Sequence, residues 1–79
     1  MAMNFKQYDV VRLKGIPSPD KFNAEFDLRS PVVGDVATIV EVYKNPPGYE
    51  LECSDSEGVT QWLIAWGPDE IELELLVAS

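Results

Sequence analysis

The sequence predicts an all-β fold of five short strands. Two observations carry this prediction: short segments rich in β-branched and aromatic residues alternate between apolar and polar positions, and clusters of glycine, proline, asparagine or aspartate separate them. The chain has 79 residues, which is room for one domain, residues 1–79, around one hydrophobic core.

The first predicted strand covers residues 8–14 and is closed by Gly15 and the prolines that follow. A long irregular connection, residues 15–33, comes next and contains three prolines. Ser18-Pro19-Asp20 is typical of a helix start, and Phe22 and Phe26 are spaced to share one helical face. Two structures remain open here: a short helix, or a loop that the two phenylalanines attach to the barrel. A connection of this length tends to be functional or mobile.

The second predicted strand, residues 36–43, follows Gly34-Asp35 and is the most β-branched segment of the chain. Strict alternation places three valines on one face, Val36, Val40 and Val42. Residues 45–48, Asn-Pro-Pro-Gly, predict a turn, because proline cannot continue a strand ladder and Gly48 accepts a positive φ.

The third predicted strand, residues 49–53, alternates cleanly. Tyr49, Leu51 and Cys53 point inward in this pattern, and Glu50 and Glu52 point to solvent. Residues 55–58 then form a short hairpin loop that ends in glycine.

The fourth predicted strand, residues 59–65, ends at Gly67-Pro68, and the last covers residues 71–75 with its glutamates in water. A long first connection, two hairpins and a short final turn are the order of an SH3-like barrel, and a barrel removes exposed strand edges. The first and last strands pair in such a barrel. Arg12 and Lys14 then stand opposite Glu72 and Glu74, in cross-strand ion pairs.

Several of these segments resemble a bacterial family catalogued as domain of unknown function 4926. The resemblance rests on Tyr8–Val11, on Gly34–Tyr43, and on Tyr49–Glu52 followed by Asp55–Gly58. It covers most of the chain outside the first connection, and it departs from the family pattern at Ala37, where glycine is usual. The resemblance implies an SH3-like fold and a bacterial origin, and it implies no reaction.

The charge balance argues against two classes of partner. Fourteen acidic and six basic residues give a net charge of −8, and the cations are scattered along the sequence. Nucleic acids and anionic membranes attract clustered lysine and arginine, so we expect neither as a partner. With no membrane-length apolar segment and a single cysteine, Cys53, we expect a soluble cytoplasmic protein.

The sequence offers no catalytic constellation. It lacks histidine, the commonest general acid–base residue, and Cys53 sits at an inward position with carboxylates nearby, which predicts a buried structural thiol. One thiol cannot form a disulfide or a structural zinc site, and Asp55-Ser56-Glu57 lacks the ligand spacing of an EF-hand. We therefore expect no enzyme activity, no metal and no cofactor. A carboxylate-based metal enzyme is the least supported alternative.

The fourth strand is apolar on both faces. Trp62, Ile64 and Trp66 lie on one face and Leu63 lies on the other, so one face forms the core and the other needs a cover. Three covers remain open: the first connection through Phe22 and Phe26, another protein, or a peptide held in an aromatic groove.

These features predict a small acidic, non-enzymatic module that binds a protein partner or itself. A small domain without disulfides or metal gains stability by oligomerisation, which keeps self-association open. The predicted partner-binding residues are the aromatic and apolar ones of the fourth strand together with a nearby tyrosine and acidic rim: Trp62, Ile64, Trp66, Tyr43, Glu41, Glu50 and Glu52. The alternative function is an antitoxin or immunity-type inhibitor, whose acidity would match a basic toxin.

Overall fold

The computed structural model describes residues 5–17 and 25–79, and these form five antiparallel strands with no helix among them. The strands are β1 (Val10–Gly15), β2 (Val36–Lys44), β3 (Pro47–Ser54), β4 (Thr60–Trp66) and β5 (Glu72–Val77). All five predicted strands are confirmed, with ends displaced by one or two residues. The predicted helix start at Ser18, together with Phe22, lies outside the described residues.

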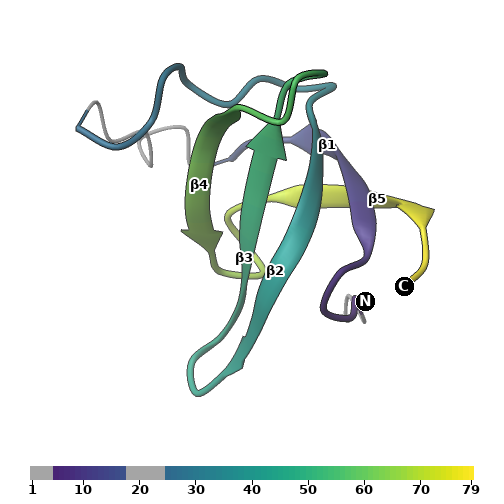
Figure 1. The fold of residues 1–79 in the computed structure, drawn as a ribbon. Helices are drawn as coiled ribbons and strands as arrows, with labels where there is room; N and C mark the ends of the chain where they lie inside the picture. Colours follow the sequence, from purple (N-terminus) through teal and green to yellow (C-terminus); the bar gives the residue numbers. More distant parts are fainter. Residues whose placement is uncertain (1–4, 18–24) are drawn as a thin grey trace.

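One sheet contains all five strands in the order β4-β3-β2-β1-β5. The sheet curls so that β5 crosses the direction of β2, β3 and β4 (Figure 1), which gives the molecule a barrel-like form. The predicted small five-stranded all-β fold is confirmed. The sheet is not closed, however, because β4 and β5 do not pair and remain as two edges.

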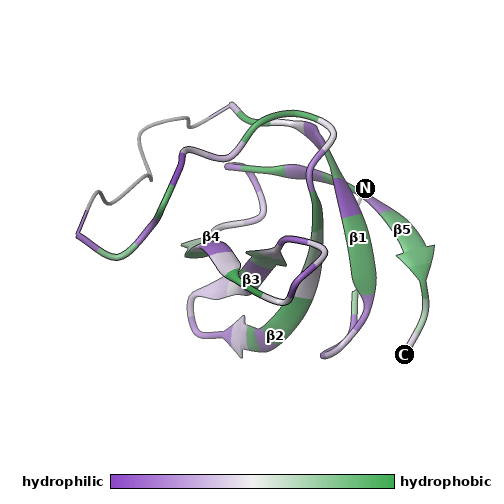
Figure 2. Cartoon of the chain, turned by 45° about the horizontal axis from the view of Figure 1, so that its top comes forward, coloured by the Kyte–Doolittle hydropathy of each residue, from purple (hydrophilic) through white to green (hydrophobic). Residues whose placement is uncertain are grey.

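The core is built from the inward face of the curled sheet. Along β1, hydrophobic and hydrophilic residues alternate (Figure 2), and Val11 and Leu13 are fully buried while Arg12 and Lys14 are exposed. The cluster of buried hydrophobic residues draws on four strands and on the residue before β5: Val11, Leu13, Ala37, Ile39, Tyr49, Leu51, Cys53, Trp62, Ile64, Trp66 and Ile71.

The predicted facing of β2 is wrong in its first half. Ala37 and Ile39 are buried, whereas Val36 is 44% exposed. An irregularity in the β2–β3 register between Ile39 and Glu41 shifts the alternation by one residue, so that Val42 then packs against the core. Strict alternation cannot anticipate such a bulge.

The predicted facing of β3 is confirmed, since Tyr49, Leu51 and Cys53 are all buried. The role assigned to Gly48 is wrong, because positive φ values among the described glycines occur at Gly34 and Gly58. A Cβ at Gly48 would instead lie 2.7 Å from the Trp66 backbone oxygen. Glycine is needed there for the close approach of β3 to β4.

Asp35 anchors the end of the first connection to the core. Its carboxylate accepts two hydrogen bonds from the Arg29 guanidinium, at 2.9 and 3.0 Å, and one at 3.0 Å from the indole Nε1 of Trp62. The Val32 amide donates a further bond at 3.0 Å. Burial alone would raise the pKa of Asp35, but these donors outweigh it and hold the pKa below its ordinary value of 3.8.

The same connection covers part of the free edge of β4, and we call residues 27–29 the edge strap. The buried Asp27 carboxylate accepts a hydrogen bond from the Leu63 amide at 3.1 Å. The Leu28 amide donates to the Gln61 carbonyl at 2.8 Å. The strap therefore satisfies backbone groups that an edge strand otherwise exposes.

The predicted pairing of the first and last strands is confirmed. Of the two ion pairs predicted between them, one is confirmed. Arg12 stands opposite Glu74, with Nη1 and Oε1 3.3 Å apart. Glu72 stands opposite Gly15 rather than Lys14, because the β1–β5 register shifts between Leu13 and Gly15.

Candidate functional site

Three of the predicted partner-binding residues lie in the core. Trp62, Ile64 and Trp66 are only 0%, 6% and 1% exposed. The two tryptophan rings pack edge to face, with centroids 6.3 Å apart. The tryptophan face of β4 is thus the core face, and the prediction that a partner covers these three side chains is corrected: the sheet curls around them.

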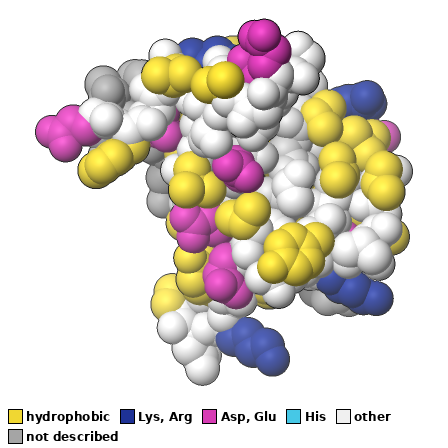
Figure 3. Space-filling model, in the orientation of Figure 1, with side chains coloured by type: hydrophobic (Ala, Val, Ile, Leu, Met, Phe, Trp, Pro, Cys, Tyr) yellow, Lys and Arg dark blue, Asp and Glu magenta, His cyan; other side chains and the backbone are white. Residues whose placement is uncertain are grey.

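The other four predicted residues lie together on the outer face of β2 and β3. Glu41 stands opposite Glu50 in the β2–β3 register, and Glu52 is the next outward residue of β3. We call Glu41, Glu50 and Glu52 the acidic face. Figure 3 shows acidic side chains down the middle of this view, between hydrophobic ones, with lysine and arginine at its periphery.

Neutral donors, not cations, accompany the acidic face. The Tyr43 hydroxyl donates a hydrogen bond to Glu50, and the Thr60 hydroxyl donates to Glu52 at 2.7 Å. The bond to Glu50, followed by burial and the charges of Glu50 and Glu41, raises the pKa of Tyr43 above 10.0. Among the described residues, no lysine or arginine forms an ion pair with these three carboxylates. Their charge is therefore available to a partner.

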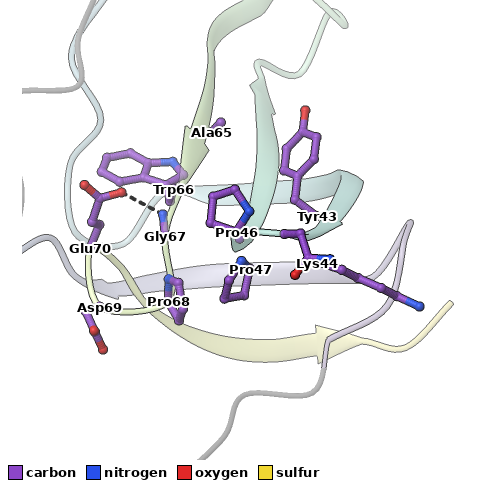
Figure 4. A pocket seen from close by; sticks show the side chains of 12 residues that line it. Tyr43, Lys44, Pro46, Pro47, Ala65, Trp66, Gly67, Pro68, Asp69 and Glu70 are labelled. Atoms are coloured by element: carbon purple, nitrogen blue, oxygen red, sulfur yellow. Dashed lines mark hydrogen bonds between the residues drawn. The ribbon is translucent and has the colours of Figure 1, made fainter.

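A cleft of about 620 Å³ opens at the end of the sheet beside the acidic face. It lies between the β2–β3 turn and the β4–β5 connection, with Tyr43 and Trp66 at opposite sides and Pro46 and Pro68 between them (Figure 4). The remaining lining residues are Lys44, Asn45, Pro47, Gly48, Ala65, Gly67, Asp69 and Glu70. Its volume lies in the range of small-ligand and peptide sites.

Glu70 stabilises the β4–β5 side of the cleft. Glu70 accepts a hydrogen bond from the Gly67 amide at 2.7 Å, which closes the turn between the strands (Figure 4). On the inner wall, the buried indole Nε1 of Trp66 has no hydrogen-bond partner among the described residues. The sequence contained one signal for this cleft, namely that its prolines gather in two connections that antiparallel pairing brings to the same end.

The outer face of β4 is not covered by the described part of the first connection. Leu63 is 46% exposed and Phe26 is 78% exposed, so Phe26 does not fold over the sheet as one interpretation required. The connection covers the edge of β4 instead. Leu63 stands opposite Glu52 of the acidic face, and an exposed apolar side chain beside a carboxylate is typical of the border of a protein interface.

The reactive groups are used structurally. Cys53 is buried, and burial raises the pKa of its thiol, aided by the charge of Asp35 and opposed by Arg29, whose Nη2 lies 3.6 Å from Sγ. Asp55 accepts hydrogen bonds from the amides of Glu57 and Val59, both at 2.9 Å, and so shapes the β3–β4 turn. Within residues 5–17 and 25–79, no cluster of three metal-ligating side chains occurs.

Comparison with known proteins adds no relative. No family model matches the chain, and neither a curated protein nor a solved structure matches it significantly. The resemblance to domain of unknown function 4926 therefore stays a prediction. In the described part of the chain, no helix is long and apolar enough to cross a membrane.

Proposed function

We propose that this protein is a non-enzymatic interaction module that binds a basic protein through the acidic face. The supporting observation is the grouping of Glu41, Glu50 and Glu52 on one exposed surface without a described cation among them. Complementary charge of this kind speeds association and selects partners by their sign. The net charge of −8 adds long-range attraction for a basic surface.

The neighbouring surface fits this function. Tyr43 and Leu63 are large, partly exposed side chains beside the carboxylates, and tyrosine is enriched at interfaces. A second copy of the chain would bring a like-charged surface to the same place. The acidic face therefore favours a different, basic protein over self-association.

An immunity-type inhibitor of a basic toxin is one specific form of this function. The net charge favours it, because tight inhibitors of basic enzymes gain association rate from acidity. An inhibition assay on any nuclease found among the bound proteins would test this form directly.

A charge-matched capture experiment tests the proposal. The wild type, Glu50→Gln/Glu52→Gln and Glu57→Gln/Glu72→Gln are immobilised and exposed to a lysate of the native host. The two variants have equal net charge, and Glu57 and Glu72 lie on the β3–β4 turn and β5. We expect basic proteins on the wild type and the second variant, and their loss from the first. Equal capture by all three proteins would contradict the proposal.

Light scattering at low and high protein concentration separates the self-association alternative. The proposal expects a monomer at both concentrations. A concentration-dependent dimer would favour self-association, and it should become more stable at high salt, because salt screens the repulsion between two acidic faces.

A further inference from the structure

The described residues cover the edge of β4 along only part of its length. Gln61 turns its carbonyl, and Leu63 its amide, toward the edge strap. In an antiparallel strand, alternate residues turn both backbone groups to the same side. Ala65 therefore also turns its amide and carbonyl to this edge, and no described residue hydrogen-bonds with them there.

The part of the edge that no described residue covers adjoins the cleft. Ala65 and Trp66 belong to the cleft lining, so a chain that paired with Ala65 would continue directly into the cleft. The last hydrogen bond between the described part of the edge strap and β4 is the one at Leu63. The edge and the cleft thus form one continuous, elongated surface at this side of the molecule.

The cleft offers mainly acceptors. Pro46, Pro47 and Pro68 contribute no backbone N–H, and Asp69 and Glu70 add carboxylates. Among the described lining residues one is a cation, Lys44, and its side chain extends away from the cleft in Figure 4. A ligand that brings donors and positive charge is therefore favoured over one that brings carboxylates.

At the Tyr43 side of the cleft, an aromatic ring of the lining adjoins a carboxylate of the acidic face. The ring of Tyr43 is partly exposed, and its hydroxyl is hydrogen-bonded to Glu50 on the acidic face. An ammonium or guanidinium group gains from both neighbours at once, through the face of the ring and through the carboxylate.

We propose that the Ala65 edge and the adjoining cleft bind an extended basic segment of a partner protein. The segment adds to β4 as a strand, pairs with the Ala65 amide and carbonyl, and places a lysine or arginine side chain against Tyr43 and Glu50. This inference rests on the proposed function and specifies how the partner is held: backbone pairing supplies affinity, and the basic side chain supplies selection.

The test uses a short, end-capped peptide of alternating lysine and valine as the probe. Titration into the wild-type protein, followed by NMR of the backbone amides, is expected to shift Ala65, Trp66 and Tyr43 and to slow exchange of the Ala65 amide. A second peptide is N-methylated at alternate residues, which removes the amides of one edge. We expect it to bind about tenfold more weakly, as loss of main-chain hydrogen bonds predicts.

Two protein variants test the same contacts from the other side. Ala65→Pro removes the edge-facing amide, and proline is tolerated in an edge strand where that amide faces away from the neighbouring strand. Ala65→Val is its control, because it keeps the amide. We expect Ala65→Pro to bind the peptide about tenfold more weakly than Ala65→Val does. Tyr43→Leu is expected to reduce the preference for the lysine–valine peptide over a glutamate–valine peptide of the same length. The N-methylated peptide tests the wild type, so the result stands even if Ala65→Pro fails to fold.

The outcomes separate this inference from the proposed function. If the lysine peptide binds in a Glu50- and Glu52-dependent way but is insensitive to N-methylation, basic partners use the acidic face and strand addition is wrong. Chemical-shift changes on β5 in place of Ala65 would also overturn strand addition. So would binding of the glutamate–valine peptide as tight as that of the lysine–valine peptide. Failure of the charge-matched capture would overturn the proposed function itself.

Discussion

The two edges of the sheet, β4 and β5, are protected in different ways. The edge strap crosses β4 and satisfies its backbone at Gln61 and Leu63. No described segment crosses the free edge of β5, whose residues Leu75, Leu76 and Val77 are exposed. Both edges belong to one open sheet, so both face the same hazard of pairing with another chain.

The β5 edge is protected by irregularity and charge. The β1–β5 register shifts twice, between Val10 and Val11 and between Leu13 and Gly15, and such bulges bend a strand out of the flat form that other strands recognise. Glu72 and Glu74 add charge along the strand. The β3–β4 register shifts only near Gln61, within the stretch that the strap covers, and is regular from Trp62 to Trp66. The difference teaches that β4 relies on a polar cover, and that Ala65, which no described residue covers, presents the backbone of the regular part of this strand.

Acidification is expected to give the largest effect, because it removes two carboxylate anchors at once, Asp35 and Asp9. The pKa of Asp35 and that of Asp9 both lie below 3.8; for Asp9 the main cause is the hydrogen bond from the Lys6 amide, followed by that from Ser79. A carboxylate with a lowered folded-state pKa stabilises the protein fully above its unfolded pKa, and this stabilisation is lost as pH falls through the folded value. Urea denaturation from about pH 5 to about pH 2 should show a steady fall in unfolding free energy. An unfolding free energy that does not change between these pH values would contradict the stabilising role of both carboxylates.

Asp35→Ala should have the largest effect of a single substitution. It removes the partner of Arg29 and leaves the indole donor of Trp62 unpaired, at a cost of about 3 kcal/mol in unfolding free energy. Amide exchange at Leu63 should also accelerate, because Arg29 ends the edge strap. The control is Asp69→Ala, an exposed position expected to change stability by less than about 0.5 kcal/mol. If amide exchange at Leu63 stayed unchanged in Asp35→Ala, Asp35 would not be needed to hold the edge strap in place.

Asp27→Ala tests the strap alone. Loss of the acceptor for the Leu63 amide should cost about 1 to 2 kcal/mol and accelerate exchange at Leu63. Asp27→Asn keeps an acceptor oxygen and should cost less. Exchange of amides in β5 should stay unchanged in both variants, and a comparable acceleration there would show that the two edges are not protected independently.

Glu74→Gln should have the smallest effect. The Arg12–Glu74 pair is nearly half exposed on both sides, with side-chain exposures of 46% and 44%, so its loss should cost about 0.5 kcal/mol at most. A double-mutant cycle with Arg12→Met measures the pair itself. The coupling should vanish at high salt, whereas a coupling that resists salt would show that charge pairing is a principal stabiliser of β5.

The sequence predicted those parts of the fold that depend on local pattern. Alternation identified the inward residues of β3 correctly, because the choice of face there does not depend on a distant segment. It failed in β2, where the register shift after Ile39 inverts the faces. The two-sided apolar β4 was recognised, but only the curvature of the sheet decides that Trp62, and not Leu63, enters the core.

The candidate site was predicted in part. Glu41, Glu50, Glu52 and Tyr43 lie on one face, as outward positions of adjacent strands should. The strap and the cleft were missed, because both depend on which backbone groups a distant segment reaches. Asp27 carries no pattern that marks it as a partner of the Leu63 amide, thirty-six residues away.

The position of β1 between β2 and β5 has a consequence for how the chain acquires its fold during synthesis. β1 leaves the ribosome first, yet both of its neighbours come later: β2 after a long connection, and β5 at a sequence separation of 62 between Arg12 and Glu74. The β2–β3–β4 meander is joined by short turns and can form from local contacts. The edge of β1 that pairs with β5 therefore stays unpaired until β5 has been translated. Completion of the sheet is expected to be a late, slow step of folding.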